Sequence, residues 1–116
     1  MHELSLCDDL LSQVIAIAAQ HNAPSVESIT LQIGALSGVE PTLLDSAFSM
    51  IKAGTVAEQA HLIMQTLPAT VLCRTCGAQS EVDANRLLCK DCQSNETTLL
   101  SGDELILASV ALDCVY

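Results

Sequence analysis

The feature that most constrains this chain is a pair of Cys-x-x-Cys motifs separated by residues 77–88. The first motif runs Cys73-Arg-Thr-Cys76 and precedes Gly77, and the second runs Cys89-Lys-Asp-Cys92. Each motif is a tight turn that directs two thiolates at one cation, and Gly77 can adopt the positive φ that such a turn often needs. Two such turns close a sulfur tetrahedron, which suits zinc best and iron second. The spacing therefore predicts a metal site at these four cysteines.

The segment around this site is too poor in apolar residues to fold by hydrophobic burial alone. Its candidates for a core are Val71, Leu72, Val82, Leu87 and Leu88. Structural zinc supplies roughly 10 kcal/mol or more of folding free energy, which offsets that deficit. No further feature nearby, such as an open ligand position with a carboxylate base, indicates catalysis, so the site is expected to be structural. We therefore expect a zinc-ribbon-like lobe over residues 69–102.

Hydrophobic periodicity outside this lobe predicts two helices and three strands. Ser5 is the expected N-cap of the first helix and Asn22 its stop, while Pro41 opens the second helix and Gly54 caps its end. The expected elements are a helix over 4–21, a strand over 26–36, a helix from 41 to 54, and strands over 61–67 and 104–112.

These elements predict an α+β fold, a small three-stranded sheet with two helices on one face. The metal lobe is then an insertion between the second and third strands. The main domain becomes discontinuous, with residues 1–68 and 103–116, and the lobe occupies residues 69–102.

Composition restricts the partners and the compartment. The formal charge is −10 with only four Lys plus Arg, which argues against nucleic acid and anionic membranes as partners. The first residues do not resemble a signal peptide, and no apolar run is long enough to span a membrane. We expect a cytoplasmic protein in a reducing compartment, where cysteines act as metal ligands or buried thiols. Cys7 and Cys114, which lie outside the motifs, are expected to be buried thiols.

The first three residues, Met1, His2 and Glu3, form a chelating sequence if the terminus is free. The α-amine, the His2 amide nitrogen and the imidazole can close fused rings around one cation, and the Glu3 amide completes a planar set of four nitrogens. Planar nitrogen sites favour Ni²⁺ or Cu²⁺ over zinc. From these three residues alone, however, an ordinary exposed terminus is the better interpretation.

The cysteine motifs alone fit two functions. The first is a zinc-ribbon module that binds nucleic acid or protein, although the acidic charge and the scarcity of aromatic residues oppose nucleic-acid binding. A thiol oxidoreductase is the second, but neither motif follows a strand at the start of a helix, where redox cysteine pairs usually lie. Nothing in the sequence indicates an enzyme.

Several segments taken together resemble one known family. They are Met1-His2-Glu3-Leu4-Ser5 opening a helix, the run Ile-Gly-Ala-Leu-Ser-Gly-Val-Glu-Pro at residues 33–41, Gly54-Thr55, the paired cysteine motifs and Gly102-Asp103-Glu104-Leu105. Their order and spacing resemble the HypA/HybF family of nickel metallochaperones over essentially the whole chain.

This resemblance implies a carrier that delivers Ni(II) for [NiFe]-hydrogenase maturation, or in some bacteria for urease. It implies a GTPase partner of the HypB type, a hydrogenase large-subunit precursor as recipient, and a monomer or homodimer. Carried over residue by residue, Met1, His2 and Glu3 are nickel-binding, Glu40 occupies a position near nickel in some members, and the zinc on the four cysteines is structural. With the family in view, nickel binding becomes the better interpretation of the terminus.

Overall fold

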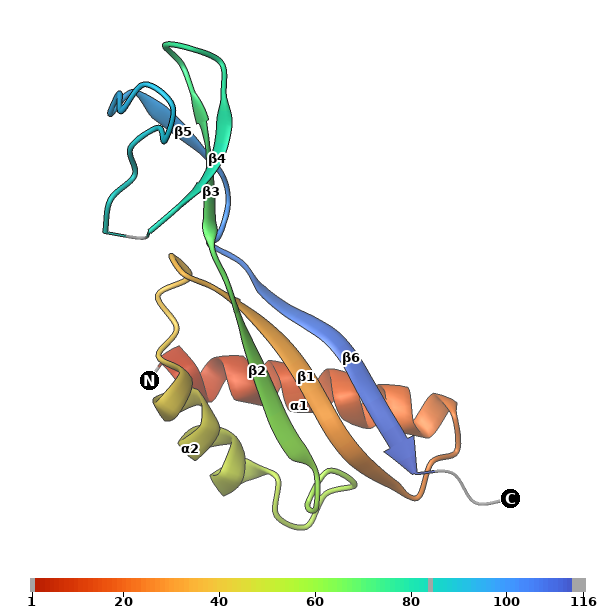
Figure 1. The fold of residues 1–116 in the computed structure, drawn as a ribbon. Coiled ribbons are helices and arrows are strands. Elements are labelled where there is room, and N and C mark those ends of the chain that lie inside the picture. The colour runs from red at the N-terminus through yellow and green to blue at the C-terminus, as the bar shows by residue number, and fades with distance from the viewer. Residues whose placement is uncertain (1, 84, 114–116) are drawn as a thin grey trace. The chain divides into compact units, whose positions relative to one another are not determined.

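A computed structural model describes residues 2–83 and 85–113 of the chain, and of His2 it describes the backbone. Within these described residues, two helices and six strands follow one another (Figure 1). They are α1 (His2–Gln20), β1 (Ser25–Gly34), α2 (Pro41–Ile51), β2 (His61–Leu67), β3 (Ala69–Cys73), β4 (Gln79–Val82), β5 (Thr97–Ser101) and β6 (Leu105–Asp113). The strands form two three-stranded sheets, in the orders β2-β1-β6 and β4-β3-β5. The predicted α+β class, with two helices, a small sheet and a zinc-ribbon-like lobe, is confirmed.

Residue contacts divide the chain into two compact units. The helical unit comprises Met1–Leu31, Val39–Met64 and Leu107–Tyr116, and the cysteine unit comprises Gln32–Gly38 and Gln65–Ile106. Residues 32–38 thus group with the cysteine unit. The functional domains expected from the sequence, 1–68 with 103–116 and 69–102, stay a prediction.

The helical unit has an aliphatic core between the two helices and β1. Helix α1 contributes Cys7, Leu10 and Val14 to one buried stripe, because residues three or four apart lie on the same helix face. The Cys7 thiol donates a hydrogen bond to the Leu44 carbonyl of α2 at 3.2 Å, which joins the two helices. Cys7 is therefore the buried thiol that we expected, whereas Cys114 lies outside the described residues.

The helix ends correct two predictions. Helix α1 begins at His2, so Ser5 lies inside it and the expected Ser5 N-cap is wrong. Helix α2 ends on Lys52, which keeps a right-handed conformation and donates its N–H to Phe48, so the expected Gly54 cap is also wrong. Gly54 instead opens the next turn, where its N–H donates to the Glu58 carboxylate at 2.7 Å. Asn22, with φ of 53°, ends α1 as predicted.

None of the helices in residues 2–83 and 85–113 combines the length and the apolar character that a membrane crossing requires.

The cysteine unit contains a sheet that the sequence pattern did not predict. Strand β3 is central and pairs antiparallel with β4 and with β5, with a register irregularity between Thr70 and Val71. Its core is small and consists of Ala69, Val71 and Val82, against which Leu36, Leu87 and Leu99 pack. Leu36 comes from the 32–38 segment, which is why that segment belongs to this unit.

A close backbone crossing in the cysteine unit depends on glycine. The Leu36 N–H donates to the Gly102 carbonyl at 2.6 Å, and the Gly34 N–H donates to the Glu104 carbonyl at 2.8 Å. A Cβ added to Gly34 would collide with the Gly102 carbonyl group. The crossing therefore excludes every side chain at position 34 and holds Leu36 in the core.

Candidate metal centre

The four cysteines predicted as metal ligands come together in the cysteine unit. Their sulfur atoms all lie within 4.8 Å of one another, and the closest contacts are 3.5 Å for Cys73 to Cys92 and 3.6 Å for Cys76 to Cys89. Zn–S bonds of about 2.3 Å give a tetrahedron with S–S edges of about 3.8 Å. The spacing thus matches a tetrahedral zinc site, and the free thiols Cys73 and Cys89 are buried while Cys76 and Cys92 are exposed.

The two turns that carry the ligands have the same backbone design. In the first, the Cys73 N–H donates to Ala78 at 2.8 Å and the Gly77 N–H donates to Cys73 at 3.0 Å. In the second, the Cys89 N–H donates to Ser94 at 3.0 Å and the Gln93 N–H donates to Cys89 at 2.9 Å. Each turn therefore folds back on its first cysteine and presents both thiols on one side.

Hydrogen bonds from the backbone prepare the first cysteine of each turn for a metal. The amides of Cys76 and Thr75 both donate to the Cys73 sulfur at 3.3 Å and lower the pKa of Cys73 to about 6. The amides of Cys92 and Asp91 likewise lower the pKa of Cys89. A preformed thiolate binds a cation without first losing a proton.

The second cysteine of each turn behaves differently before metal binds. The Ala78 amide favours the Cys76 thiolate, but the neighbouring sulfurs of Cys89 and Cys92 outweigh that bond and raise the pKa of Cys76 to about 12. The pKa of Cys92 is also raised, because the Cys73 sulfur and burial outweigh the Ser94 amide. Zinc must displace these two protons, so its binding depends on pH.

A contact across the two turns is a part of the site that sequence reasoning missed. The Thr75 and Ser94 hydroxyls lie 3.0 Å apart, and the Ser94 oxygen also accepts the Glu96 N–H at 3.1 Å. Thr75 lies between the ligands of the first turn and Ser94 follows the second. The sequence gives little indication of this contact, because isolated Ser and Thr residues are common in loops.

The residues predicted to bind nickel lie in the helical unit or outside the described residues. His2 opens α1 and the half-buried Glu3 lies in its first turn, whereas Met1 is outside the described residues. The Glu40 carboxylate is the N-cap of α2, where it accepts the Thr42 N–H at 3.3 Å. Among the side chains of residues 3–83 and 85–113, only the four cysteines form a cluster of three or more possible metal ligands.

Comparison with known proteins gives the same family over nearly the whole chain. A family model described as "Hydrogenase/urease nickel incorporation, metallochaperone, hypA" matches residues 1–112. The hydrogenase maturation factor HypA of Nitrosospira multiformis is 46% identical over 97% of both chains. That of Aquifex aeolicus is 42% identical over 97% of this chain and 98% of its own.

Two solved structures share the fold. The solution structure of the nickel metallochaperone HypA from Helicobacter pylori has a TM-score of 0.69 at 23% identity, covering 97% of this chain and 98% of its own. A second solution structure of a HypA protein has a TM-score of 0.74 at 24% identity, covering 97% and 96%.

Proposed function

The chain belongs to the HypA family of hydrogenase/urease nickel-incorporation metallochaperones, and we propose that it carries Ni(II) on Met1, His2 and Glu3. It is a maturation factor for nickel enzymes and not itself an enzyme. The four cysteines fit structural zinc, and nickel is the cargo. The proposal concerns where on this chain the cargo binds.

The observation that carries the proposal is the start of helix α1 at His2. The first N–H groups of an α-helix have no acceptor within the helix. The His2 and Glu3 amides are therefore not committed to helical hydrogen bonds and can serve Ni(II) as deprotonated nitrogen ligands. The α-amine and the imidazole supply the remaining nitrogens of a planar set.

The composition of the cysteine site supports a separate nickel site. Four thiolates complete a tetrahedron around zinc and leave no open position for a second cation. A cargo must also be released, so it needs ligands that protons or a partner can displace. A terminal amine and one imidazole meet that requirement better than four thiolates do.

Glu40 enters the proposal as an auxiliary group. Its carboxylate has two oxygens, of which one accepts the Thr42 N–H in the α2 cap. The second oxygen remains for a cation or for a partner. Its contribution to nickel affinity is expected to be smaller than that of His2, because an N-cap carboxylate is already engaged at the helix end.

The partners and the compartment follow from the family resemblance and are proposed with it. The recipient is a [NiFe]-hydrogenase large-subunit precursor, with a GTPase of the HypB type as co-worker. Transfer takes place in the cytoplasm, and the carrier is a monomer or a homodimer. The charge of −10 opposes a nucleic-acid partner and an anionic membrane surface.

A nickel titration of the untagged, zinc-loaded protein tests the proposal. Wild-type protein is expected to bind one nickel at about micromolar Kd, or about −8 kcal/mol, which permits release. His2→Ala removes the imidazole and is expected to weaken nickel binding at least about tenfold, or 1.4 kcal/mol. His21→Ala is the matched control, because His21 is exposed beyond the last residue of α1. Unchanged nickel affinity and unchanged hydrogenase maturation in His2→Ala would contradict it.

A further inference from the structure

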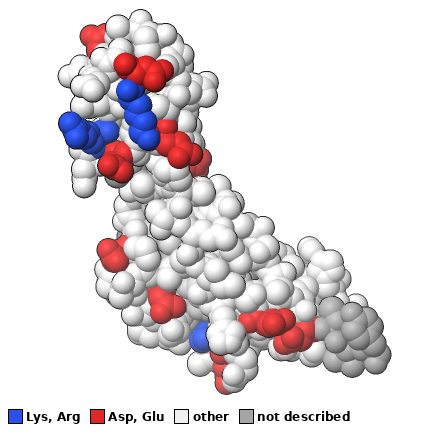
Figure 2. All heavy atoms as spheres, in the orientation of Figure 1, with Lys and Arg blue, Asp and Glu red and all other residues white. Residues whose placement is uncertain are grey.

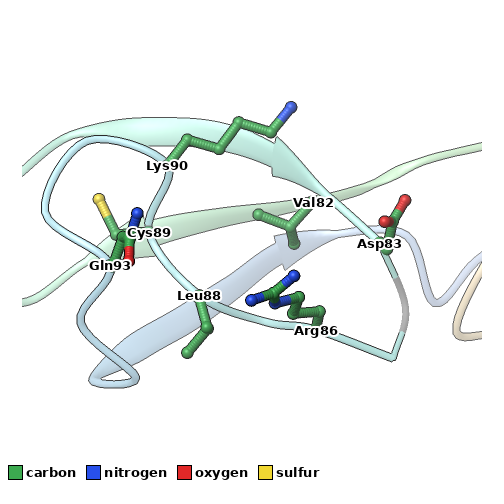
Figure 3. A pocket seen from close by; sticks show the side chains of 7 residues that line it. All are labelled: Val82, Asp83, Arg86, Leu88, Cys89, Lys90 and Gln93. Carbon is green, nitrogen blue, oxygen red and sulfur yellow. The ribbon is translucent and has the colours of Figure 1, made fainter.

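The second cysteine turn borders a pocket that the zinc site does not explain. The pocket has a volume of about 270 Å³ and lies entirely within the cysteine unit. Figure 3 shows the seven residues that line it, which are Val82, Asp83, Arg86, Leu88, Cys89, Lys90 and Gln93. Val82 and Leu88 give it an apolar surface, while its longest side chains are the two cations.

The pocket contains half of the cations of an acidic chain. The chain has four Lys plus Arg against fourteen Asp plus Glu, and both Arg86 and Lys90 line this pocket. In Figure 2 the positive atoms gather mainly over the upper part of the surface, beside negative ones. Within the part of the chain that the structure describes, no carboxylate makes a salt bridge with Arg86 or Lys90. Both cations are exposed and available to an external anion.

Local hydrogen bonds fix the segment that carries Arg86. The Arg86 N–H donates to the Asp83 carbonyl at 2.9 Å, and the Thr97 hydroxyl donates to the Leu87 carbonyl at 2.9 Å. In Figure 3 the Arg86 side chain reaches beneath Val82, and the Asp83 carboxylate points away from it. The guanidinium is thus directed into the pocket from a braced backbone.

Gln93 supplies an independent indication that the pocket has a use. It has φ of 60° and follows the second cysteine pair, at the place that Gly77, with φ of 79°, occupies after the first. Residues with a Cβ rarely adopt this backbone conformation, whereas glycine adopts it freely. The second turn therefore has a strained residue, Gln93, where the first turn has an unstrained glycine, Gly77. The Gln93 side chain lines the pocket. Such strain at a surface pocket is typical of a functional position.

We propose that this pocket binds a carboxylate side chain of a protein partner, with Arg86 and Lys90 pairing the charge and Gln93 donating a hydrogen bond. The apolar surface of Val82 and Leu88 accommodates an aliphatic neighbour of that carboxylate. The pocket is then a docking point on the zinc lobe for an acidic-aliphatic segment. It is separate from the nickel ligands, and it stands whether or not nickel binds at the terminus.

Charge distinguishes a carboxylate from a polyanion such as a nucleotide phosphate. The two cations and Asp83 give the exposed lining a charge of about +1, and the adjacent zinc with four thiolates carries about −2. A single negative charge is neutralised by that lining, whereas a diphosphate carries more negative charge than the lining can neutralise and is repelled more strongly by the adjacent thiolate site. A monoanionic group is therefore the favoured occupant.

The test uses the full chain, zinc-loaded and free of nickel, with blocked peptides as probes. Leu-Glu-Leu is expected to shift the amide resonances of residues 86–93 saturably, and Leu-Gln-Leu to produce no saturable shift. Arg86→Gln and Lys90→Gln are expected to weaken Leu-Glu-Leu binding about two- to fivefold each, the range for an exposed ion pair. Arg74→Gln, which removes an exposed cation from the first turn outside the pocket, is the matched control and should change nothing.

Gln93→Gly separates binding from folding. It relaxes the turn to the form already present at Gly77, so zinc content and Tm are expected to be equal or higher while Leu-Glu-Leu binding weakens. Undiminished peptide binding in Gln93→Gly, or equal binding of Leu-Glu-Leu and Leu-Gln-Leu, would overturn the proposal. Tighter binding of inorganic pyrophosphate than of Leu-Glu-Leu would also overturn it and identify a phosphate site. None of these outcomes bears on nickel at Met1, His2 and Glu3.

Discussion

Individual backbone amides determine much of the electrostatics of this chain. The Cys73 and Cys89 thiolates are favoured by amide donors within their own turns, without a nearby basic side chain as cause. The Glu104 carboxylate likewise accepts the Gly102 N–H at 2.7 Å. These backbone N–H groups stabilise the negative charge of the side chains that accept their hydrogen bonds, a role that Lys or Arg side chains often have in less acidic proteins.

The hydrogen bond between the Gly102 N–H and the Glu104 carboxylate predicts that the free energy of unfolding depends on pH. Hydrogen bonds from the Gly102 amide, then from the Glu104 and Asp103 amides, lower the pKa of Glu104 below its ordinary 4.5. A lowered folded-state pKa contributes stability above the ordinary value, and that contribution is lost as pH falls through the folded-state pKa. Glu104→Gln is therefore expected to be less stable than wild type near pH 7, by an amount that shrinks below about pH 4.5.

Denaturant unfolding of wild type and Glu104→Gln at a series of pH values measures this difference. The two proteins are compared at pH values at which both retain zinc, because the cysteine unit that contains Glu104 relies on zinc. Glu81→Gln, at an exposed position on β4, is the matched control and should leave the pH profile unchanged. A stability gap that stays constant as the pH falls below 4.5, while both proteins retain zinc, would refute the role of the Glu104 charge.

At the scale of elements, the backbone crossing near Gly34 is the most specific requirement. Gly34→Ala places a Cβ against the Gly102 carbonyl, where only backbone movement can make room. We expect a loss of about 3 kcal/mol in unfolding free energy, typical of forced overpacking. Gly38→Ala is the matched control: its Cβ meets nothing within 4 Å, so only the positive φ costs stability, about 1 kcal/mol. Equal losses of unfolding free energy in the two variants would show that the backbone near Gly34 can move to accommodate a Cβ without strain.

Some of the helices and strands could be predicted from the sequence, and others could not. Periodicity located both helices and the strands β1, β2 and β6, because each has a run with one dominant period. It missed the β4-β3-β5 sheet, whose strands are short and whose core includes Leu36 from a distant segment. Cap residues were wrong at Ser5 and Gly54, since propensity alone does not decide which of several residues ends a helix.

The four-cysteine site could be predicted from the sequence, whereas the neighbouring pocket could not. Cys-x-x-Cys spacing predicted which cysteines come together, because each motif forms a turn that presents both of its thiols on one side. The pocket of Arg86, Lys90 and Gln93 was not predictable, because its shape depends on how residues 82–93 fold around the metal. Only the comparison of Gln93 with Gly77, at matching places in the two motifs, gave a hint in the sequence.

At the scale of the whole molecule, the two compact units depend on different forces. The helical unit has an aliphatic core, whereas the buried cluster described in the cysteine unit is small, formed by Ala69, Val71 and Val82, and zinc is expected to supply the rest of its stability. Cys73→Ser is therefore expected to abolish stable zinc binding and unfold the cysteine unit while much of the helical circular-dichroism signal remains. Cys7→Ser is the matched control, because it keeps a hydrogen-bond donor to Leu44 in the helical unit and should retain zinc.

Zinc analysis and circular dichroism on the two cysteine variants separate the contributions. Loss of the entire spectrum in Cys73→Ser would show that the helical unit cannot fold without the zinc lobe. Zinc loss in Cys7→Ser would show that the dependence runs the other way as well.

The most direct test of the whole account is a nickel titration, followed by X-ray absorption at the nickel edge, of untagged protein and of protein with two residues added before Met1. The extension leaves His2 and the four cysteines intact and removes only the terminal amine from its chelate ring. We predict nitrogen-dominated nickel in the untagged protein and a nickel affinity at least about tenfold weaker in the extended one. Equal affinity, or sulfur ligands at nickel in either protein, would contradict the assignment of the cargo to the terminus.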